Sequence, residues 1–261
     1  MVSERFESAR NFVNKLWNAA RFVLMNLDGY QPQAVDISDL PLEDRWLLSR
    51  LSTVTREVTN AIEHYRFAEA SRTLYDFAWD EFCSFYAEMA KPRFEDPASR
   101  PVAQRVMANV LDALLRLLHP MMPFITEEVW QLLGQVAPQR GLSELEAPSA
   151  SLVIASWPTP DLEHQDAQLE EQFARFQGVL GALREIRSRQ GIAPKEPIEF
   201  RVKCDAESVA LLQPMQRYFS SMARASGSDW GDDVTPPPTH AKVTVQEMDV
   251  FVDLQDFLDI D

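Results

Sequence analysis

The sequence predicts a mainly α-helical protein, in which an antiparallel helix bundle is followed by a small α/β appendage. Apolar residues recur three or four positions apart through most of residues 1–190, which is the spacing of one helix face. Alternation with period two, typical of a strand, first appears at Ile198–Val202. The connections between the early helices are short, so neighbouring helices should run antiparallel. We therefore divide the chain into a helical bundle (1–160), a long connecting helix (161–194) and the α/β appendage (195–261).

The first predicted helix, Ser8–Leu27, contains no proline or glycine and is helical in its periodicity throughout. On a helical wheel, the side that we expect to be core gathers Phe6, Ala9, Val13, Leu16, Trp17, Ala20, Leu24 and Leu27. The opposite ridge carries Asn11, Lys15, Asn18 and Phe22, with Arg21 on its flank. Two interpretations of Phe22 stay open. Its ring packs under a neighbouring helix, or it stacks on unpaired RNA bases while the amides and cations bond base edges and phosphate.

Further helices are expected at about residues 42–65, 68–90 and 101–118, from residue 126 onward, and at 166–189. The helix at 68–90 should stop at Lys91–Pro92, because the residue before a proline resists helical geometry. Thr126 is the expected N-cap of the helix that it begins. In the appendage, the expected strands are Ile198–Val202, Val243–Val245 and Val250–Val252, and a short kinked helix lies at Ala206–Ser220.

Composition and motifs exclude several classes of function. The net charge of −15 argues against a general nucleic-acid binder, so an RNA contact must be local. No Gly-rich phosphate loop, P-loop or dinucleotide fingerprint is present, and the four histidines are scattered. Cys83 and Cys204 follow no metal spacing and indicate reduced thiols in a cytoplasmic protein, and no apolar run has the length of a membrane span. We therefore expect no catalytic, cofactor or metal site and interpret the chain as a binding module.

Several motifs resemble the anticodon-binding helical domain of the class I valyl-tRNA synthetases, and together they cover nearly the whole chain. They are Arg10–Leu24, Asp44–Trp46, Trp79–Cys83 with Tyr86, Lys91–Pro92, His119–Glu128 and Ser156–Pro158. The His-Pro and Trp-Pro motifs are shared with isoleucyl and leucyl relatives. The Asn-Lys-Leu-Trp-Asn-Ala run of the first helix favours the valyl family.

This resemblance implies a bundle of the class Ia anticodon-binding type that reads the anticodon loop of valine tRNA. It places base contacts on Lys15, Arg21 and Phe22. We add three neighbours from the helical wheel and from adjacency: Asn11, Asn18 and Tyr86.

The two catalytic signatures of that family, His-Ile-Gly-His and Lys-Met-Ser-Lys-Ser, do not occur in this sequence. The chain therefore looks like a piece of a valine-tRNA ligase whose ATP-using catalytic domain and basic C-terminal coiled coil lie outside it. We expect it to hold no cofactor, to be inactive alone, to be monomeric and to make no membrane contact. The alternative is a free-standing paralogue that acts as a regulatory or protein-interaction module.

Overall fold

The computed structural model describes residues 4–257, which form two compact units that divide between Asp166 and Ala167. A mainly helical chain with a small sheet is confirmed. The expected connecting helix (161–194) corresponds to α7 (Ala167–Arg189), which belongs to the second unit. None of the helices in the described residues is long and apolar enough to cross a membrane.

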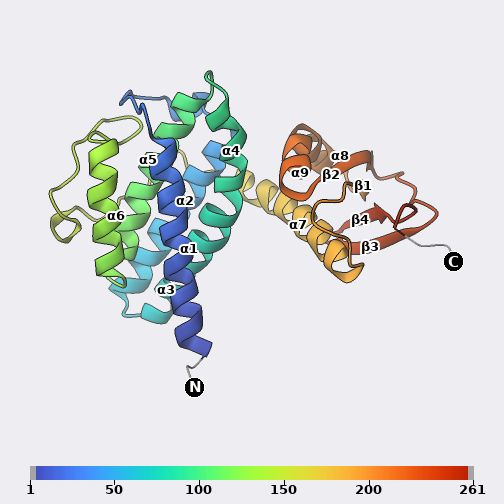
Figure 1. The fold of residues 1–261 in the computed structure, drawn as a ribbon, viewed down its shortest axis with the longest axis horizontal. Coiled ribbons are helices and arrows are strands. Elements are labelled where there is room, and N and C mark those ends of the chain that lie inside the picture. Colours follow the sequence, from blue (N-terminus) through green and yellow to red (C-terminus); the bar gives the residue numbers. More distant parts are fainter. Residues whose placement is uncertain (1–3, 258–261) are drawn as a thin grey trace. The chain divides into compact units, whose positions relative to one another are not determined.

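The first unit is a helix bundle in which α1 contacts α5, α6 and the π-helical segment η2 (Figure 1). The buried side chains of α2 include Trp46, Leu47, Leu51, Val54 and Val58, as the periodicity predicted. The elements of this unit are α1 (Glu4–Asn26), η1 (Ile37–Asp39), α2 (Leu42–Glu63), α3 (Phe67–Asp76), η2 (Phe77–Tyr86), α4 (Ala87–Glu95), α5 (Arg100–Leu118), α6 (Pro123–Val136) and η3 (Leu152–Ile154).

The buried side of α1 differs from the predicted one. Leu16, Ala20 and Leu27 are buried as expected, but Phe12 and Val23 complete this side. The expectation that Phe6, Val13 and Trp17 belong to the core is wrong, since their side chains are 70%, 37% and 40% exposed. The reason is that α1 carries apolar residues on two sides, so a hydrophobic pattern alone does not choose which side faces the bundle.

The helix that was expected to end at Lys91–Pro92 continues to Glu95. It runs through α3, η2 and α4 without a break, and Pro92 lies inside α4. A proline inside a helix costs about 3 kcal/mol because it removes a hydrogen bond and crowds the preceding turn. The residues directly after it, Arg93 and Phe94, are both buried, and their tertiary contacts offset that cost.

The start of α6 also differs from the prediction. The helix begins at Pro123, whose missing N–H is harmless in a first turn. Thr126 is therefore not an N-cap. Its buried hydroxyl donates to the Met122 carbonyl at 2.8 Å and lies 2.8 Å from His119 Nδ1, so His119 is a hydrogen-bonded residue of the turn before α6.

The second unit packs helices on a four-stranded sheet of order β2-β1-β4-β3. β1 and β2 are parallel, whereas β1/β4 and β3/β4 are antiparallel. The three expected strands lie within β1, β3 and β4, but β2 gave no sequence signal. Its residues, Ala-Ser-Gly-Ser-Asp-Trp-Gly, include few strand formers. The elements are α7, β1 (Ile198–Lys203), α8 (Ala206–Leu212), η4 (Gln213–Met215), α9 (Gln216–Ala223), β2 (Ala225–Gly231), β3 (His240–Val245) and β4 (Met248–Asp253).

Aromatic rings fill the space between the helices and the sheet of this unit. Phe176 of α7 lies 4.7 Å from Phe219 of α9, which in turn lies 5.2 Å from Phe200 of β1, measured between ring centroids. At Gly178, α7 approaches β3 so closely that an added Cβ would lie 3.0 Å from Val245 Cγ2. This glycine therefore sets the distance between the helix and the sheet.

Candidate nucleic-acid interface

One accessible side of α1 carries five of the six predicted RNA-contacting residues. Asn11, Asn18 and Arg21 are exposed, and Lys15 and Phe22 are partly exposed. At about 100° per residue, these five side chains occupy roughly a third of the helix circumference. The structure thus brings them together on one surface, which we call the α1 ridge.

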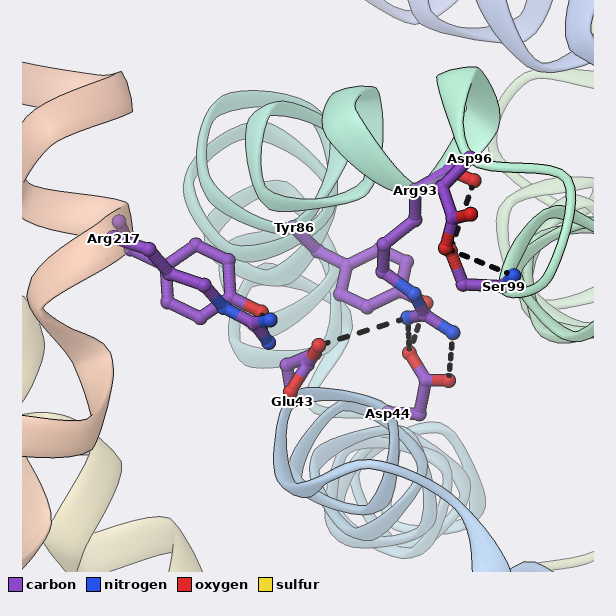
Figure 2. Close-up of polar contacts among 8 residues, drawn as sticks. Glu43, Asp44, Tyr86, Arg93, Asp96, Ser99 and Arg217 are labelled. Carbon is purple, nitrogen blue, oxygen red and sulfur yellow. Dashed lines mark hydrogen bonds and ion pairs between the residues drawn. The ribbon is translucent and has the colours of Figure 1, made fainter.

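Tyr86, the sixth predicted residue, does not join the α1 ridge. It is fully buried, and its hydroxyl donates to the Asp44 carboxylate (Figure 2). Arg93 holds the same carboxylate with two nitrogens, one of them 2.8 Å from Asp44 Oδ2. Burial and the neighbouring Asp44 raise the pKa of Tyr86 well above its ordinary value. The prediction of Tyr86 as an RNA contact is therefore wrong, because adjacency in a motif does not show which residue faces inward.

Lys15 is held against η2. Its ammonium donates a hydrogen bond to Ser84 Oγ and lies 3.9 Å from the centroid of the Trp79 ring, which is a cation-π contact. Partial burial lowers the pKa of Lys15, while the Asp80 carboxylate acts in the opposite direction. A lysine has three rotatable donors on a flexible stem, so this ammonium retains donors for a ligand.

The structure shows that Phe22 packs against a neighbouring helix, the first of the two interpretations that the sequence left open, and that part of its ring stays accessible. Its ring packs edge-on against Phe94 of α4, with centroids 5.8 Å apart and an interplanar angle of 74°. Lys91 places its ammonium 6.0 Å from the centroid of the same ring. The ring stays partly exposed, so the contact with Phe94 fixes its orientation and leaves surface for a ligand. A ring that is held in place in this way loses little entropy when it binds.

The π-helical geometry of η2 places a tryptophan beside the α1 ridge. In η2 the backbone bonds span five residues, as in the bond from the Ala87 N–H to the Phe82 carbonyl. The Ser84 hydroxyl follows the same spacing and donates to the Trp79 carbonyl at 2.7 Å. Sequence reasoning did not place Trp79 beside the α1 ridge, although it lies in one of the family motifs, because a pattern read at 3.6 residues per turn does not reveal a π-helix.

Charges around the α1 ridge are mixed. Lys91 pairs with Glu88 at 2.6 Å on the surface of α4, and the exposed Asp76 and Asp80 lie on the helix that carries Trp79. With a net charge of −15 on the whole chain, long-range attraction to a polyanion is weak. Recognition at this surface therefore depends on short-range stacking and hydrogen bonds.

Another hollow of the first unit is mainly apolar, is lined by no residue of the α1 ridge and has a volume of about 640 Å³. Its lining includes Ile62, Phe67, Met121, Trp157 and one carboxylate, Glu63. A single carboxylate offers no acid-base pair for catalysis. Within residues 4–257, no group of three or more His, Cys, Asp and Glu side chains is arranged to hold a metal ion.

Comparison with known proteins connects this geometry to a family. The model for the anticodon-binding domain of tRNA ligase matches residues 44–202. The valine-tRNA ligase of Rhodopirellula baltica is 55% identical over 263 residues, which span 100% of this chain and 25% of that protein. The valine-tRNA ligase of Geobacter sulfurreducens is 38% identical over 268 residues, or 100% of this chain and 29% of that protein. For the Thermotoga maritima valine-tRNA ligase, the identity is 35% over 256 residues, or 98% of this chain and 27% of that protein.

The solved ternary complex of a LeuRS from Agrobacterium radiobacter K84 with tRNA and LeuAMS aligns with a TM-score of 0.43 and 21% identity. The alignment covers 62% of this chain and 17% of the LeuRS chain. The chain spans only about a quarter of the length of the valine-tRNA ligases that it matches. The sequence match over more than half of the chain shows that it belongs to the family of anticodon-binding domains of tRNA ligases, and within that family it resembles the valine-tRNA ligases.

Proposed function

We propose that this chain binds the anticodon loop of valine tRNA as the anticodon-binding part of a valine-tRNA ligase. Family membership and the identity to valine-tRNA ligases over the whole chain support this proposal. The observation that carries it is the α1 ridge, where Lys15, Arg21 and Phe22 are accessible at the positions where the family resemblance expects base contacts. The same relatives favour this function over that of a regulatory paralogue.

Each residue type of the α1 ridge has a chemical role in this proposal. Phe22 stacks on an unpaired base, for which its contact with Phe94 orients the ring. Lys15 and Arg21 donate to base edges or phosphate oxygens. Asn11 and Asn18 carry both a donor and an acceptor, so they can bond complementary groups on a base edge.

ATP-dependent attachment of valine to tRNA is, in this proposal, an activity of a longer protein that includes a catalytic domain. The chain itself then binds no cofactor and is inactive alone. We further propose that it is a monomer that works in the cytoplasm. Sedimentation velocity tests the oligomeric state, and a mass of twice 29.8 kDa would contradict the monomer.

Titration of labelled valine tRNA against the wild-type chain and Phe22→Ala at low salt tests the proposal. Base stacking contributes about 1–3 kcal/mol, so we expect Phe22→Ala to bind about 5- to 150-fold more weakly. Phe6→Ala is a matched control, because Phe6 is a 70% exposed phenylalanine of the same helix that lies outside the arc of the α1 ridge. Its affinity should equal that of the wild type.

The affinity of the wild type should also fall steeply as salt is added, since phosphate contacts release counterions. Equal binding by the wild type and Phe22→Ala would contradict the proposal. So would an equal preference of the wild type for an unrelated tRNA.

A further inference from the structure

Three aromatic rings pack against one another next to Lys15. The buried Phe12 stacks on Tyr75, with centroids 4.9 Å apart and an interplanar angle of 27°. Tyr75 and Trp79 lie almost parallel, at 9°, with centroids 5.6 Å apart. Tyr75 and Trp79 are both partly exposed. Phe12 and Trp79 also contact each other, with centroids 6.3 Å apart and an interplanar angle of 19°, so the three rings form a compact cluster that is anchored by a buried ring and holds Trp79 in a fixed orientation.

Lys15 covers the Trp79 ring with its ammonium, 3.9 Å from the centroid. Ser84 connects the two residues, because its hydroxyl accepts from Lys15 and donates to the Trp79 carbonyl. At a partly exposed position a cation-π contact is weak, whereas the stacking of a base on an aromatic ring is stronger. A base can therefore displace the ammonium from the ring, and the flexible lysine stem lets the ammonium stay close by.

We propose that Trp79 is a further RNA-contacting residue, whose ring takes an unpaired nucleobase in place of the Lys15 ammonium. The displaced ammonium then donates to the edge of that base or to an adjacent phosphate. This inference rests on the proposed function and extends the stacking surface from Phe22 across α1 to η2. It gives Lys15 two positions, one on the ring in the free chain and one on RNA in the complex.

The surroundings of Trp79 favour a base as the occupant over an apolar protein segment. Asn11 and Asn18 are exposed on the adjacent side of α1, and Asp80 is exposed on η2. Amides and a carboxylate beside an aromatic ring match the polar edge and flat face of a base. An apolar segment would leave these polar groups without partners once it covered them.

The test is a titration of labelled valine tRNA at low salt against the full chain and three variants. Trp79→Ala should bind about 5- to 100-fold more weakly, because a stacking face is lost. Trp79→Phe keeps an aromatic face and should stay within about threefold of the wild type. Trp17→Ala is the matched control, because Trp17 is a 40% exposed tryptophan of α1 that lies about 200° around the helix from Lys15. It should bind as the wild type does.

Wild-type affinity in Trp79→Ala overturns the inference, and so does an equal loss in Trp79→Phe and Trp79→Ala. An equal loss in Trp17→Ala and Trp79→Ala also overturns it, because the contact would then not be specific to this ring. If the wild type itself does not bind valine tRNA, the proposed function fails as well. If Phe22→Ala weakens binding and Trp79→Ala does not, only the inference fails.

A measurement on the wild type keeps the test valid if Trp79→Ala does not fold. The chain is labelled with 5-fluorotryptophan, and Trp79→Phe assigns the ¹⁹F resonance of Trp79. On addition of valine tRNA this resonance should shift, while that of the buried Trp46 should not. An unchanged Trp79 resonance in a chain saturated with tRNA overturns the inference. If an apolar peptide shifts the Trp79 resonance and tRNA does not, the ring contacts a protein partner and not RNA. That result also overturns the inference.

Discussion

The substitution Asp44→Asn tests the buried ion pair that ties α4 to α2. Asp44 is fully buried, and its two carboxylate oxygens accept hydrogen bonds from the guanidinium of Arg93, whose side chain is 8% exposed. The asparagine amide would turn an N–H group toward Arg93 Nη2, which lies 2.8 Å from the present Oδ2. The guanidinium would keep only the more distant Glu43 carboxylate, 3.9 Å from Nη1, as a counter-charge. Breaking a buried ion pair costs about 3–5 kcal/mol. For a unit of this size, that lowers the unfolding midpoint by about 6–20 °C.

Differential scanning calorimetry is the appropriate assay, because two compact units can unfold in separate transitions. Glu88→Gln provides the control, since Glu88 pairs with Lys91 on the exposed surface of α4, the helix that carries Arg93. An exposed pair contributes only about 0–1 kcal/mol, so this variant should unfold within a few degrees of the wild type. If Asp44→Asn were as mild as Glu88→Gln, the reasoning about the buried pair would be refuted.

Three other predictions concern a thiol, two glycines and an arginine. Burial raises the pKa of Cys83 to about 12, so its thiol should react with a disulfide reagent at pH 8 only on unfolding; fast reaction of the native chain would contradict this. Because the unfolded thiol titrates near 8.5, the free energy of unfolding should fall as the pH rises from about 8.5 toward 12, and less so in Cys83→Ala. Gly178→Ala should destabilise the second unit, because its added Cβ would lie 3.0 Å from Val245 Cγ2. Gly181→Ala in the same helix should stabilise the unit by about 0.5–1 kcal/mol, because its added Cβ meets nothing within 4 Å. Denaturant unfolding measures both changes. Arg187→Lys should cost about 1–3 kcal/mol by the same measurement, since the guanidinium donates to several backbone carbonyls, and the exposed Arg189→Lys should be neutral.

Periodicity predicted the helices well where one side of each is apolar and the other polar. It placed α2, α5 and α7 within about two residues of their observed ends. It failed on the orientation of α1, because Phe6 and Trp17 make a second apolar side that the bundle does not cover. It also ended a helix at Pro92, because the buried contacts that carry the helix past the proline come from other helices.

The candidate site was predictable to the extent that it lies on one helix. Lys15, Arg21 and Phe22 are accessible because a wheel groups residues of a single helix correctly relative to one another. Tyr86 was misplaced because it was chosen by its adjacency in a motif, which does not show which residue faces inward. The position of Trp79 beside α1 was not foreseen because the pitch of η2 differs from that of an α-helix. Contacts between α1 and η2 depend on the packing of two distant segments, which a local pattern does not encode.

The π-helical pitch of η2 limits how residue roles can be transferred between related chains. Lys15 contacts both Ser84 and Trp79 of η2. These two residues lie five positions apart, which is the span of one π-helical hydrogen bond, so they lie on nearly the same side of η2. In an α-helix, residues five apart are rotated by about 140° and would not face α1 together. A relative with the same side chains at the aligned positions but an ordinary α-helix in this segment would present its lysine differently. Identity of the site residues is thus insufficient for identity of the site, and the local helix type has to be compared as well.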